Sequence, residues 1–220
     1  MGLDEEQIEA VVARYERELN RYETLATTVA EFCSLVLENT KILARVQKRA
    51  KSPASLRAKL LRNEHRERYS SVDDVFLGMS DLAGVRVTTY VEADRTAVVA
   101  AIAERFAGPS GQSSPTIVLK DKTTPPEHYR ATHCQVRISE HDLLPATRNL
   151  RNDSCEIQIC SLLAHVFNEV EHDLAYKPVA GVPSEVERQH LDQLGMLTKA
   201  GDIAIGLLLQ QVQQRRGQKG

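Results

Sequence analysis

The chain has 220 residues, of which 42% are hydrophobic and 26% charged, and its formal net charge is −2. This composition is typical of a soluble globular protein that buries a core, and the near-neutral balance argues against a protein that coats nucleic acid. No apolar run approaches the roughly 18 residues needed to span a bilayer, and no signal sequence begins the chain. A cytoplasmic location without membrane contact is therefore expected.

Helical spacing of apolar side chains predicts a long amphipathic helix over residues 4–38. A short strand is expected at 42–46. A basic helix should follow from about 54 to 68, with Ser52 as its N-cap and Pro53 in its first turn.

Later segments alternate between strand and helix patterns. A β-branched strand is predicted at 85–91 with a helix behind it at 92–106, and further strands and helices follow at 116–119, 131–138, 154–160, 161–177 and 184–214. Residues 210–220 read as polar and frayed. The expected fold class is α/β (α+β), a mixed five-stranded β-sheet flanked by helices.

No linker divides the chain, so a single domain over 1–220 is predicted. Its expected parts are an N-terminal helix at 4–40, a catalytic core at 41–180, C-terminal helices at 181–214 and a frayed tail at 215–220. The four cysteines are irregularly spaced and too sparse for a disulfide scaffold, which predicts reduced, buried thiols.

Positive charge is concentrated between residues 41 and 70, where ten lysines and arginines face two acids. Within this stretch Ser55, Lys59 and Arg62 recur at intervals that place them on one face of the basic helix. Such a face suits a polyphosphate held near a helix N-terminus. The alternatives are a solvated basic surface or a track for RNA phosphates.

Two acids differ from ordinary surface carboxylates. Asp81 lies at a loop-to-strand junction with Arg86 five residues later, where an acid is most often a cap or turn residue. Glu156 lies inside the last predicted strand, where a period of two puts it on one face with Gln158 and Cys160. A carboxylate there is costly to bury unless it is paired or metal-bound. Together the two acids suit a Mg²⁺ ion in phosphoryl-type transfer, or a purely structural role.

A further pair of residues lies where a loop enters the strand predicted at 131–138. Tyr129 could stack on a nucleobase, and His133 could contact a phosphate or a ribose. Taken alone, these residue types at the start of a strand are mostly structural.

Five blocks of residues occur in order between about 45 and 180. They are Arg49 and Lys51 with Ser55 and Lys59, then Asp-Leu-Ala-Gly-Val-Arg at 81–86, Tyr-Arg-x-x-His at 129–133, Glu-Ile-Gln-Ile at 156–159, and Glu171-His172 with Tyr176-Lys177. This series resembles the synthetase domains of the RelA/SpoT family. The resemblance implies a nucleotidyltransferase-like sheet in a single-domain small synthetase that makes alarmones and does not degrade them.

The resemblance also implies roles for individual residues. ATP is expected to be held by Arg49, Lys51, Ser55, Lys59 and Arg86. Asp81 and Glu156 are expected to be catalytic and to bind Mg²⁺, with Glu156 as the base on the acceptor's 3′-hydroxyl. The residues expected to bind the acceptor are Lys122, Tyr129, His133 and Gln158.

The implied reaction transfers the β,γ-pyrophosphate of ATP to the 3′-hydroxyl of GDP or GTP, which makes (p)ppGpp. The sequence departs from the family pattern on the acceptor side. The glycine expected before Tyr129 is His128, in an altered segment at 123–128, and Cys160-Ser161 replaces an expected Arg-Thr. Two alternatives therefore stay open.

The first alternative is a toxin with a neutralising antitoxin, which would make adenosine alarmones or pyrophosphorylate the 3′ end of tRNA. The second is a catalytically silent nucleotide- or RNA-binding module. Assembly is open as well, because the apolar run at 207–209 suits either a homo-oligomer interface or the core.

Overall fold

The computed structural model describes residues 2–122, 127–176 and 182–217. Its centre is one five-stranded sheet in the order β1-β2-β5-β4-β3. The strands are β1 (Ala44–Ala50), β2 (Ala83–Thr89), β3 (Thr116–Leu119), β4 (Thr132–Val136) and β5 (Cys155–Ser161). Strands β2 and β5 run parallel, and the other neighbours are antiparallel. The predicted mixed five-stranded sheet is confirmed.

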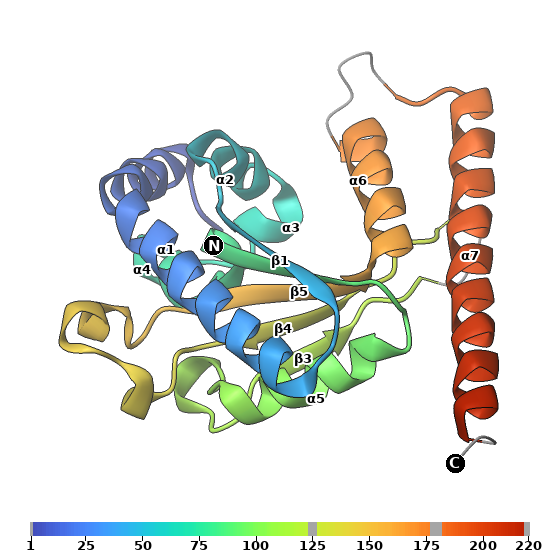
Figure 1. The fold of residues 1–220 in the computed structure, drawn as a ribbon. Coiled ribbons are helices and arrows are strands. Elements are labelled where there is room, and N and C mark those ends of the chain that lie inside the picture. The colour runs from blue at the N-terminus through green and yellow to red at the C-terminus, as the bar shows by residue number, and fades with distance from the viewer. Residues whose placement is uncertain (1, 123–126, 177–181, 218–220) are drawn as a thin grey trace.

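Helices surround this sheet on several sides. They are α1 (Glu5–Thr40), α2 (Pro53–Leu60), α3 (Asn63–Arg66), α4 (Val72–Gly78), α5 (Asp94–Arg105), α6 (Leu162–Tyr176) and α7 (Glu185–Gly217), with short 3₁₀ turns η1 (Ser80–Leu82), η2 (Pro109–Gly111), η3 (Glu140–Asp142) and η4 (Pro145–Leu150). In Figure 1, α5 lies below the strands and α1 crosses in front of them, while α2 and α6 stand above and α7 runs beside α6. Within the described ranges no helix is long and apolar enough to cross a membrane.

The long first helix follows from its cap and its apolar stripe. The Asp4 side chain accepts a hydrogen bond from the Gln7 N–H at 2.7 Å, and the Gln7 side chain accepts one from the Asp4 N–H at 3.0 Å. These reciprocal bonds form a capping box that starts the helix. Fully buried positions such as Ile8, Val11 and Leu25 then pack α1 into the main core with β2, β5 and α5. All four cysteines are buried, unpaired thiols.

The basic region differs from expectation in two ways. The strand predicted at 42–46 is β1 and extends to Ala50, because an edge strand can pair its backbone with β2 while charged side chains stay exposed. The helix predicted from 54 to 68 is wrong as a single element. It is α2 and α3, separated after Leu61, since no apolar side chain follows there to be buried before Tyr69.

The start of α2 and the end of α7 test two further predictions. Ser52 is confirmed as the N-cap of α2, with its side chain accepting from the Ser55 N–H at 3.2 Å. At the C-terminus, the expected fraying from residue 210 is wrong, because α7 is one helix through Gly217. Glutamine, leucine and arginine are good helix formers, which explains the continuation. Residues 218–220 lie outside the described part.

Candidate active site

One face of the sheet carries the polar side chains that the sequence singled out. Directly paired residues point to the same side of a sheet. The cross-strand register therefore collects six residues from four strands on this face: Arg49, Gly84, Arg86, His133, Glu156 and Gln158. On β5 the other face is fully buried in the core and consists of Cys155, Ile157 and Ile159, as the period of two predicts.

Asp81 lies between two lysines just before β2. Its Oδ2 is 2.9 Å from Lys51 Nζ and 2.8 Å from Lys59 Nζ. Burial raises the pKa of Asp81, but the two ammonium groups outweigh burial and hold the pKa below its usual value. Its Oδ1 is buried and has no hydrogen-bond partner among the described residues. The carboxylate is therefore ionised at neutral pH, with one oxygen held and the other available.

Tyr15 of α1 supports this corner from within the core. The Tyr15 hydroxyl lies 2.7 Å from the carbonyl oxygen of Lys51 and 3.0 Å from that of Leu82. The Lys51 N–H also donates to Leu82 O at 3.0 Å, so the chain segments that flank Asp81 are held together. Helical spacing predicts that Tyr15 is buried, but it carries no signal for the partners of its hydroxyl.

The other cations expected at ATP occupy different settings. The Arg49 side chain is exposed and lies across Gly84. Arg86 Nη2 is 2.8 Å from Glu169 Oε1 on α6. Arg62 does not continue the α2 face as predicted, because it is the N-cap residue of α3.

Ser55 lies in the first turn of α2, one helical turn before Lys59. Its hydroxyl accepts a hydrogen bond from Ser52 Oγ at 2.8 Å. Both serine hydroxyls therefore lie at the N-terminus of this helix, where the positive end of the helix dipole favours anions. Phosphate binding at this turn stays a prediction.

Glu156, His133 and Tyr129 form a chain of polar contacts on the acceptor side. His133 Nδ1 is 3.1 Å from Glu156 Oε1, and the Tyr129 hydroxyl is 2.9 Å from His133 Nε2. Gln158 Nε2 donates to Glu156 Oε2 at 2.8 Å. Burial raises the pKa of Glu156, while His133 and Gln158 outweigh burial and lower it. Asp81 acts in the opposite sense, so the two carboxylates influence each other electrostatically.

The remaining predicted residues lie around this chain. Lys122 is exposed, and its Nζ is 2.8 Å from Glu127 Oε1. Its backbone N–H donates to Tyr129 O at 2.8 Å. The altered acceptor segment is described only from Glu127 onward, since 123–126 lie outside the described residues. In the last block, Glu171 and His172 lie on α6 and Lys177 falls outside the described part.

The two carboxylates fit a Mg²⁺ ion. Mg²⁺ in nucleotide enzymes is usually bound by one or two carboxylates, with substrate phosphates and water completing its shell. Asp81 Oδ1 is a buried oxygen without a partner in the described part, and Glu156 supplies a second carboxylate from the neighbouring strand. No group of three potential metal ligands occurs in the described ranges. Binding of Mg²⁺ by two carboxylates and substrate phosphates does not require such a group.

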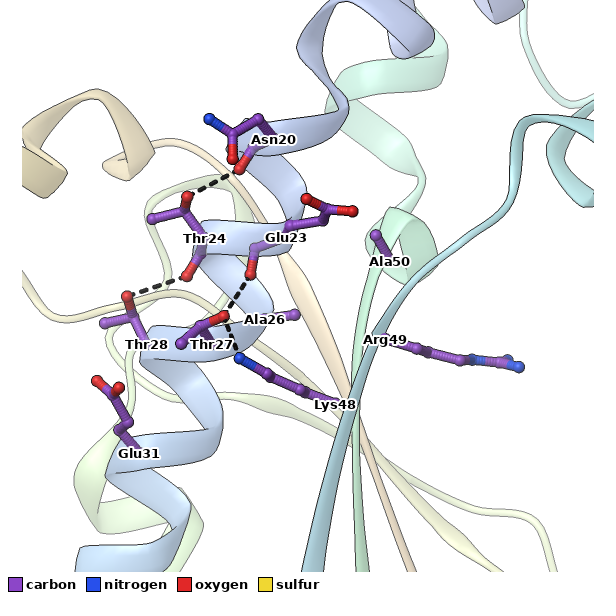
Figure 2. Close-up of a pocket in the computed structure, with 10 residues that line it drawn as sticks. All are labelled: Asn20, Glu23, Thr24, Ala26, Thr27, Thr28, Glu31, Lys48, Arg49 and Ala50. Carbon is purple, nitrogen blue, oxygen red and sulfur yellow. Dashed lines mark hydrogen bonds between the residues drawn. The ribbon is translucent and has the colours of Figure 1, made fainter.

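An open pocket of about 580 Å³ lies elsewhere, between α1 and β1. In Figure 2, Lys48 reaches Thr27 on α1, at 2.6 Å, while Arg49 points away from the helix. Of the predicted site residues, this pocket includes only Arg49. The polar face, with Glu156 on it and Asp81 at its edge, is therefore the stronger candidate site.

Residues 48–180 match the family described as a region found in RelA/SpoT proteins. The chain belongs to the RelA/SpoT family. The matched region contains all five blocks of the RelA/SpoT pattern, from Arg49 to Lys177. No curated protein matches this RelA/SpoT chain.

Solved structures share the fold of this RelA/SpoT chain. Small alarmone synthetase 1 from Bacillus subtilis has a TM-score of 0.69 at 20% identity, covering 91% of this chain and 98% of that one. A GTP pyrophosphokinase family protein from Streptococcus pneumoniae has a TM-score of 0.69 at 20% identity, with 92% and 96% covered. Small alarmone synthetase 2 from Bacillus subtilis gives 0.65 at 21%, with 90% and 98% covered. These similarities establish the fold.

Proposed function

We propose that this chain is a pyrophosphokinase that transfers the β,γ-pyrophosphate of ATP to the 3′-hydroxyl of GDP or GTP. The observation that carries the proposal is the pairing of two carboxylates at the polar face: the lysine-flanked Asp81 just before β2, and Glu156, 3.1 Å from His133, on the adjacent strand β5. Family membership and fold support a pyrophosphotransferase. Small alarmone synthetase 1 from Bacillus subtilis was solved bound to its product pppGpp and bound to AMPCPP.

On the donor side, the cations of β1, α2 and β2 would bind ATP. Phosphoryl-type transfer depends mainly on positioning and on neutralising phosphate charge, which arginine forks and lysine ammonium groups provide. The residues assigned to ATP are Arg49, Lys51, Ser55, Lys59 and Arg86. When bound at Asp81 and Glu156, Mg²⁺ would supply further charge neutralisation at the phosphates. Lys51 and Lys59 contact Asp81 in this structure. With ATP bound, each ammonium group would contact both the Asp81 carboxylate and a phosphate oxygen.

On the acceptor side, Glu156 would take the proton of the 3′-hydroxyl. The acceptor oxygen then bonds to the β-phosphorus, the bond from that phosphorus to the α,β-bridging oxygen breaks, and AMP leaves. The contact with His133 fixes the Glu156 carboxylate and keeps it ionised, so it can accept the proton. Four residues are assigned to the acceptor: Lys122, Tyr129, His133 and Gln158.

The basic stretch favours a small nucleotide over tRNA as the acceptor. Arg57 Nε is 2.6 Å from Glu9 Oε1, and Arg66 Nε donates to Leu3 O at 2.6 Å. The Glu9 carboxylate partly neutralises Arg57, and Arg66 is directed toward the chain's own backbone, which together weaken the positive surface that a phosphate track requires. The proposal includes a cytoplasmic location, where both nucleotides are available.

The test incubates purified protein with ATP labelled on its γ-phosphate, Mg²⁺, and GDP, GTP, ADP or deacylated tRNA in separate reactions. Label should appear in a 3′-pyrophosphorylated guanosine nucleotide, and unlabelled AMP should form in equal amount. Preferred labelling of ADP or tRNA would support the toxin alternative instead. Binding of ATP without transfer to any acceptor would favour the silent nucleotide-binding module.

A further inference from the structure

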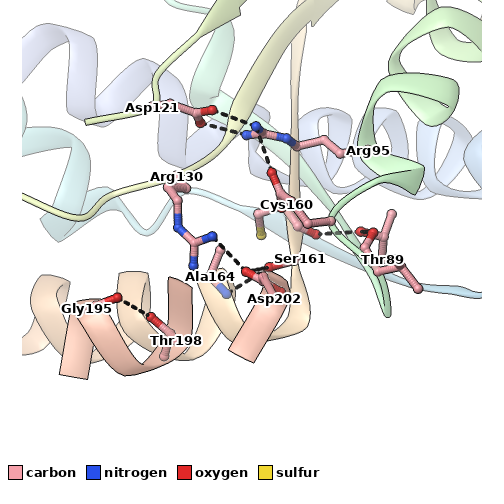
Figure 3. A network of polar contacts seen from close by, with 12 residues as sticks. Thr89, Arg95, Asp121, Arg130, Cys160, Ser161, Ala164, Gly195, Thr198 and Asp202 are labelled. Atoms are coloured by element: carbon pink, nitrogen blue, oxygen red, sulfur yellow. Dashed lines mark hydrogen bonds and ion pairs between the residues drawn. The ribbon is translucent and has the colours of Figure 1, made fainter. Parts of the chain in front are cut away.

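The segment that carries Tyr129 is held by two carboxylates of α7. Arg130 Nη1 donates to Asp202 Oδ2 at 2.7 Å, and Asp202 also accepts from Ser161 Oγ at 2.8 Å, as Figure 3 shows. Two residues earlier, His128 Nε2 lies 2.7 Å from Asp192 Oδ1. The residues on both sides of Tyr129 are therefore bound to the same helix.

The backbone beside Tyr129 is fixed as well. Asn168 of α6 accepts from the Arg130 N–H at 3.3 Å and donates to the Arg130 carbonyl oxygen at 3.1 Å. One amide side chain thus satisfies both backbone groups of Arg130, as a neighbouring strand would. On the other side the Lys122 N–H donates to Tyr129 O. Because successive side chains of an extended chain alternate, His128 and Arg130 face the helices and Tyr129 faces His133.

The Arg130–Asp202 ion pair is not expected to add much to the stability of the fold. The side chains are only 9% and 3% exposed, so both charges have lost most of their hydration. Arg130 Nε and Nη2 and Asp202 Oδ1 are buried without hydrogen-bond partners in the described part. A buried pair that is incompletely bonded stabilises a fold no better than apolar side chains of similar size would. Its directional contacts do, however, fix where the chain runs.

His128 is fitted closely into the helix pair. Its ring meets Phe167 of α6 edge-on, with centroids 5.6 Å apart and planes at 80°. On α7, a Cβ atom at Gly195 would lie 2.2 Å from the His128 ring, so the absence of a side chain there makes room for it. The histidine that replaces the glycine of the family pattern is thus an anchor to α7.

We propose that Asp192 and Asp202 are positioning residues for acceptor binding. Asp192 holds His128 and Asp202 holds Arg130, and together they fix Tyr129 at the head of the Tyr129–His133–Glu156 chain. The proposal rests on the proposed function and extends it to α7, which lies outside the family region of residues 48–180.

The kinetic test compares Asp192→Asn and Asp202→Asn with Glu185→Gln, a control on the same helix whose side chain is 70% exposed and pairs with Arg188. Both aspartate variants should raise the KM for the acceptor by about tenfold while the KM for ATP stays within about twofold. The control should change neither constant. A fall in kcat with both KM values unchanged would overturn the proposal, because it would indicate loss of folded protein alone.

A double-variant experiment tests whether Asp192 acts through Tyr129. In a Tyr129→Ala background, Asp192→Asn should add no further increase in acceptor KM, since the positioned side chain is already absent. Full additivity of the two effects would contradict the proposal. Asp192 is 30% exposed at its side chain, so this variant is expected to fold even where Asp202→Asn does not.

Hydrogen exchange provides a readout that does not depend on activity. Asp202→Asn and Asp192→Asn should speed amide exchange in the peptide covering 127–134 and leave the peptide covering β2 unchanged. Equal acceleration in both peptides, or in neither, would overturn the positioning role. If the wild-type protein transferred pyrophosphate to no acceptor, the proposed function would fail, and exchange would still decide whether α7 fixes this segment.

Discussion

His133 Nδ1 and Glu156 Oε1 lie 3.1 Å apart, and their side chains are only 8% and 12% exposed. His133 and Gln158 lower the pKa of this buried carboxylate, so it is ionised at neutral pH. The same imidazole contacts the Tyr129 hydroxyl through its other nitrogen. A change at Glu156 should therefore affect proton transfer more than the binding of ATP by the cations beside Asp81.

The first prediction concerns Glu156→Gln. Glutamine has nearly the same shape but cannot take a proton, so pyrophosphate transfer should fall by about 10²–10⁴-fold while ATP binding changes little. Transfer rates and equilibrium binding of a non-hydrolysable ATP analogue measure the two effects. Glu140→Gln, at an exposed glutamate on η3, should leave both unchanged. Transfer at the wild-type rate in Glu156→Gln would remove Glu156 from its proposed role.

The second prediction concerns pH and Asp81. The pKa of Asp81 is lowered in the folded protein, so its ion pairs stabilise the fold above the unfolded pKa near 4. That contribution should be lost as pH falls from about 5 through the lower folded pKa. Asp81→Asn should lower the free energy of unfolding by about 1–3 kcal/mol at pH 7 and flatten its decline in acid.

Urea unfolding at pH 7, 5, 4 and 3 measures this difference. Asp173→Asn provides the control, because that side chain is 79% exposed on α6. It should keep the wild-type pH profile. Parallel profiles for wild type and Asp81→Asn would show that Asp81 does not stabilise the fold through its charge.

The third prediction compares two glycines of α7. Gly195→Ala places a Cβ against the His128 ring and should destabilise the protein by about 1–3 kcal/mol. Gly206→Ala meets nothing within 4 Å and should stabilise it by about 0.5–1 kcal/mol, because alanine is the better helix former. Chemical denaturation of both variants decides the matter. Equal effects of the same sign would show that His128 does not fill the space at Gly195.

The fourth prediction concerns Arg86 and Glu169. The Glu169 side chain is 54% exposed, so its pair with Arg86 contributes little to stability. Glu169→Gln should leave the free energy of unfolding within about 0.5 kcal/mol and lower the KM for ATP about twofold, because it frees the guanidinium. Arg86→Ala should raise that KM about tenfold. An unchanged KM in Arg86→Ala would place Arg86 outside the ATP site.

Local signals explain which elements could be predicted from the sequence. The first helix has both a cap and an apolar stripe, and β3 and β5 have clear strand patterns, so their positions agree closely with expectation. The last part of β1 has no such pattern, since its charged side chains are exposed and only pairing with β2 makes it a strand. The break between α2 and α3 likewise depends on what the rest of the molecule can bury.

The candidate site divides in the same way. Residue type and order predict the polar face on which Arg49, Arg86 and Glu156 lie together. Partners from distant parts of the chain, such as Glu169 of α6 for Arg86, could not be predicted. Tyr15 contacts the backbone at Lys51, and no local pattern indicates that contact.

The Arg130–Asp202 pair also limits how modular this protein can be. Residues 48–180 form the unit that the family shares, but the guanidinium inside that unit is neutralised by a carboxylate beyond it. Separating the two would leave a buried charge without its partner, at a cost of about 3–5 kcal/mol. That cost is a large fraction of the roughly 5–15 kcal/mol by which a typical native protein is stable. The family region of this chain is thus expected to need α7 for its stability, and a fragment that ends before α7 should be destabilised.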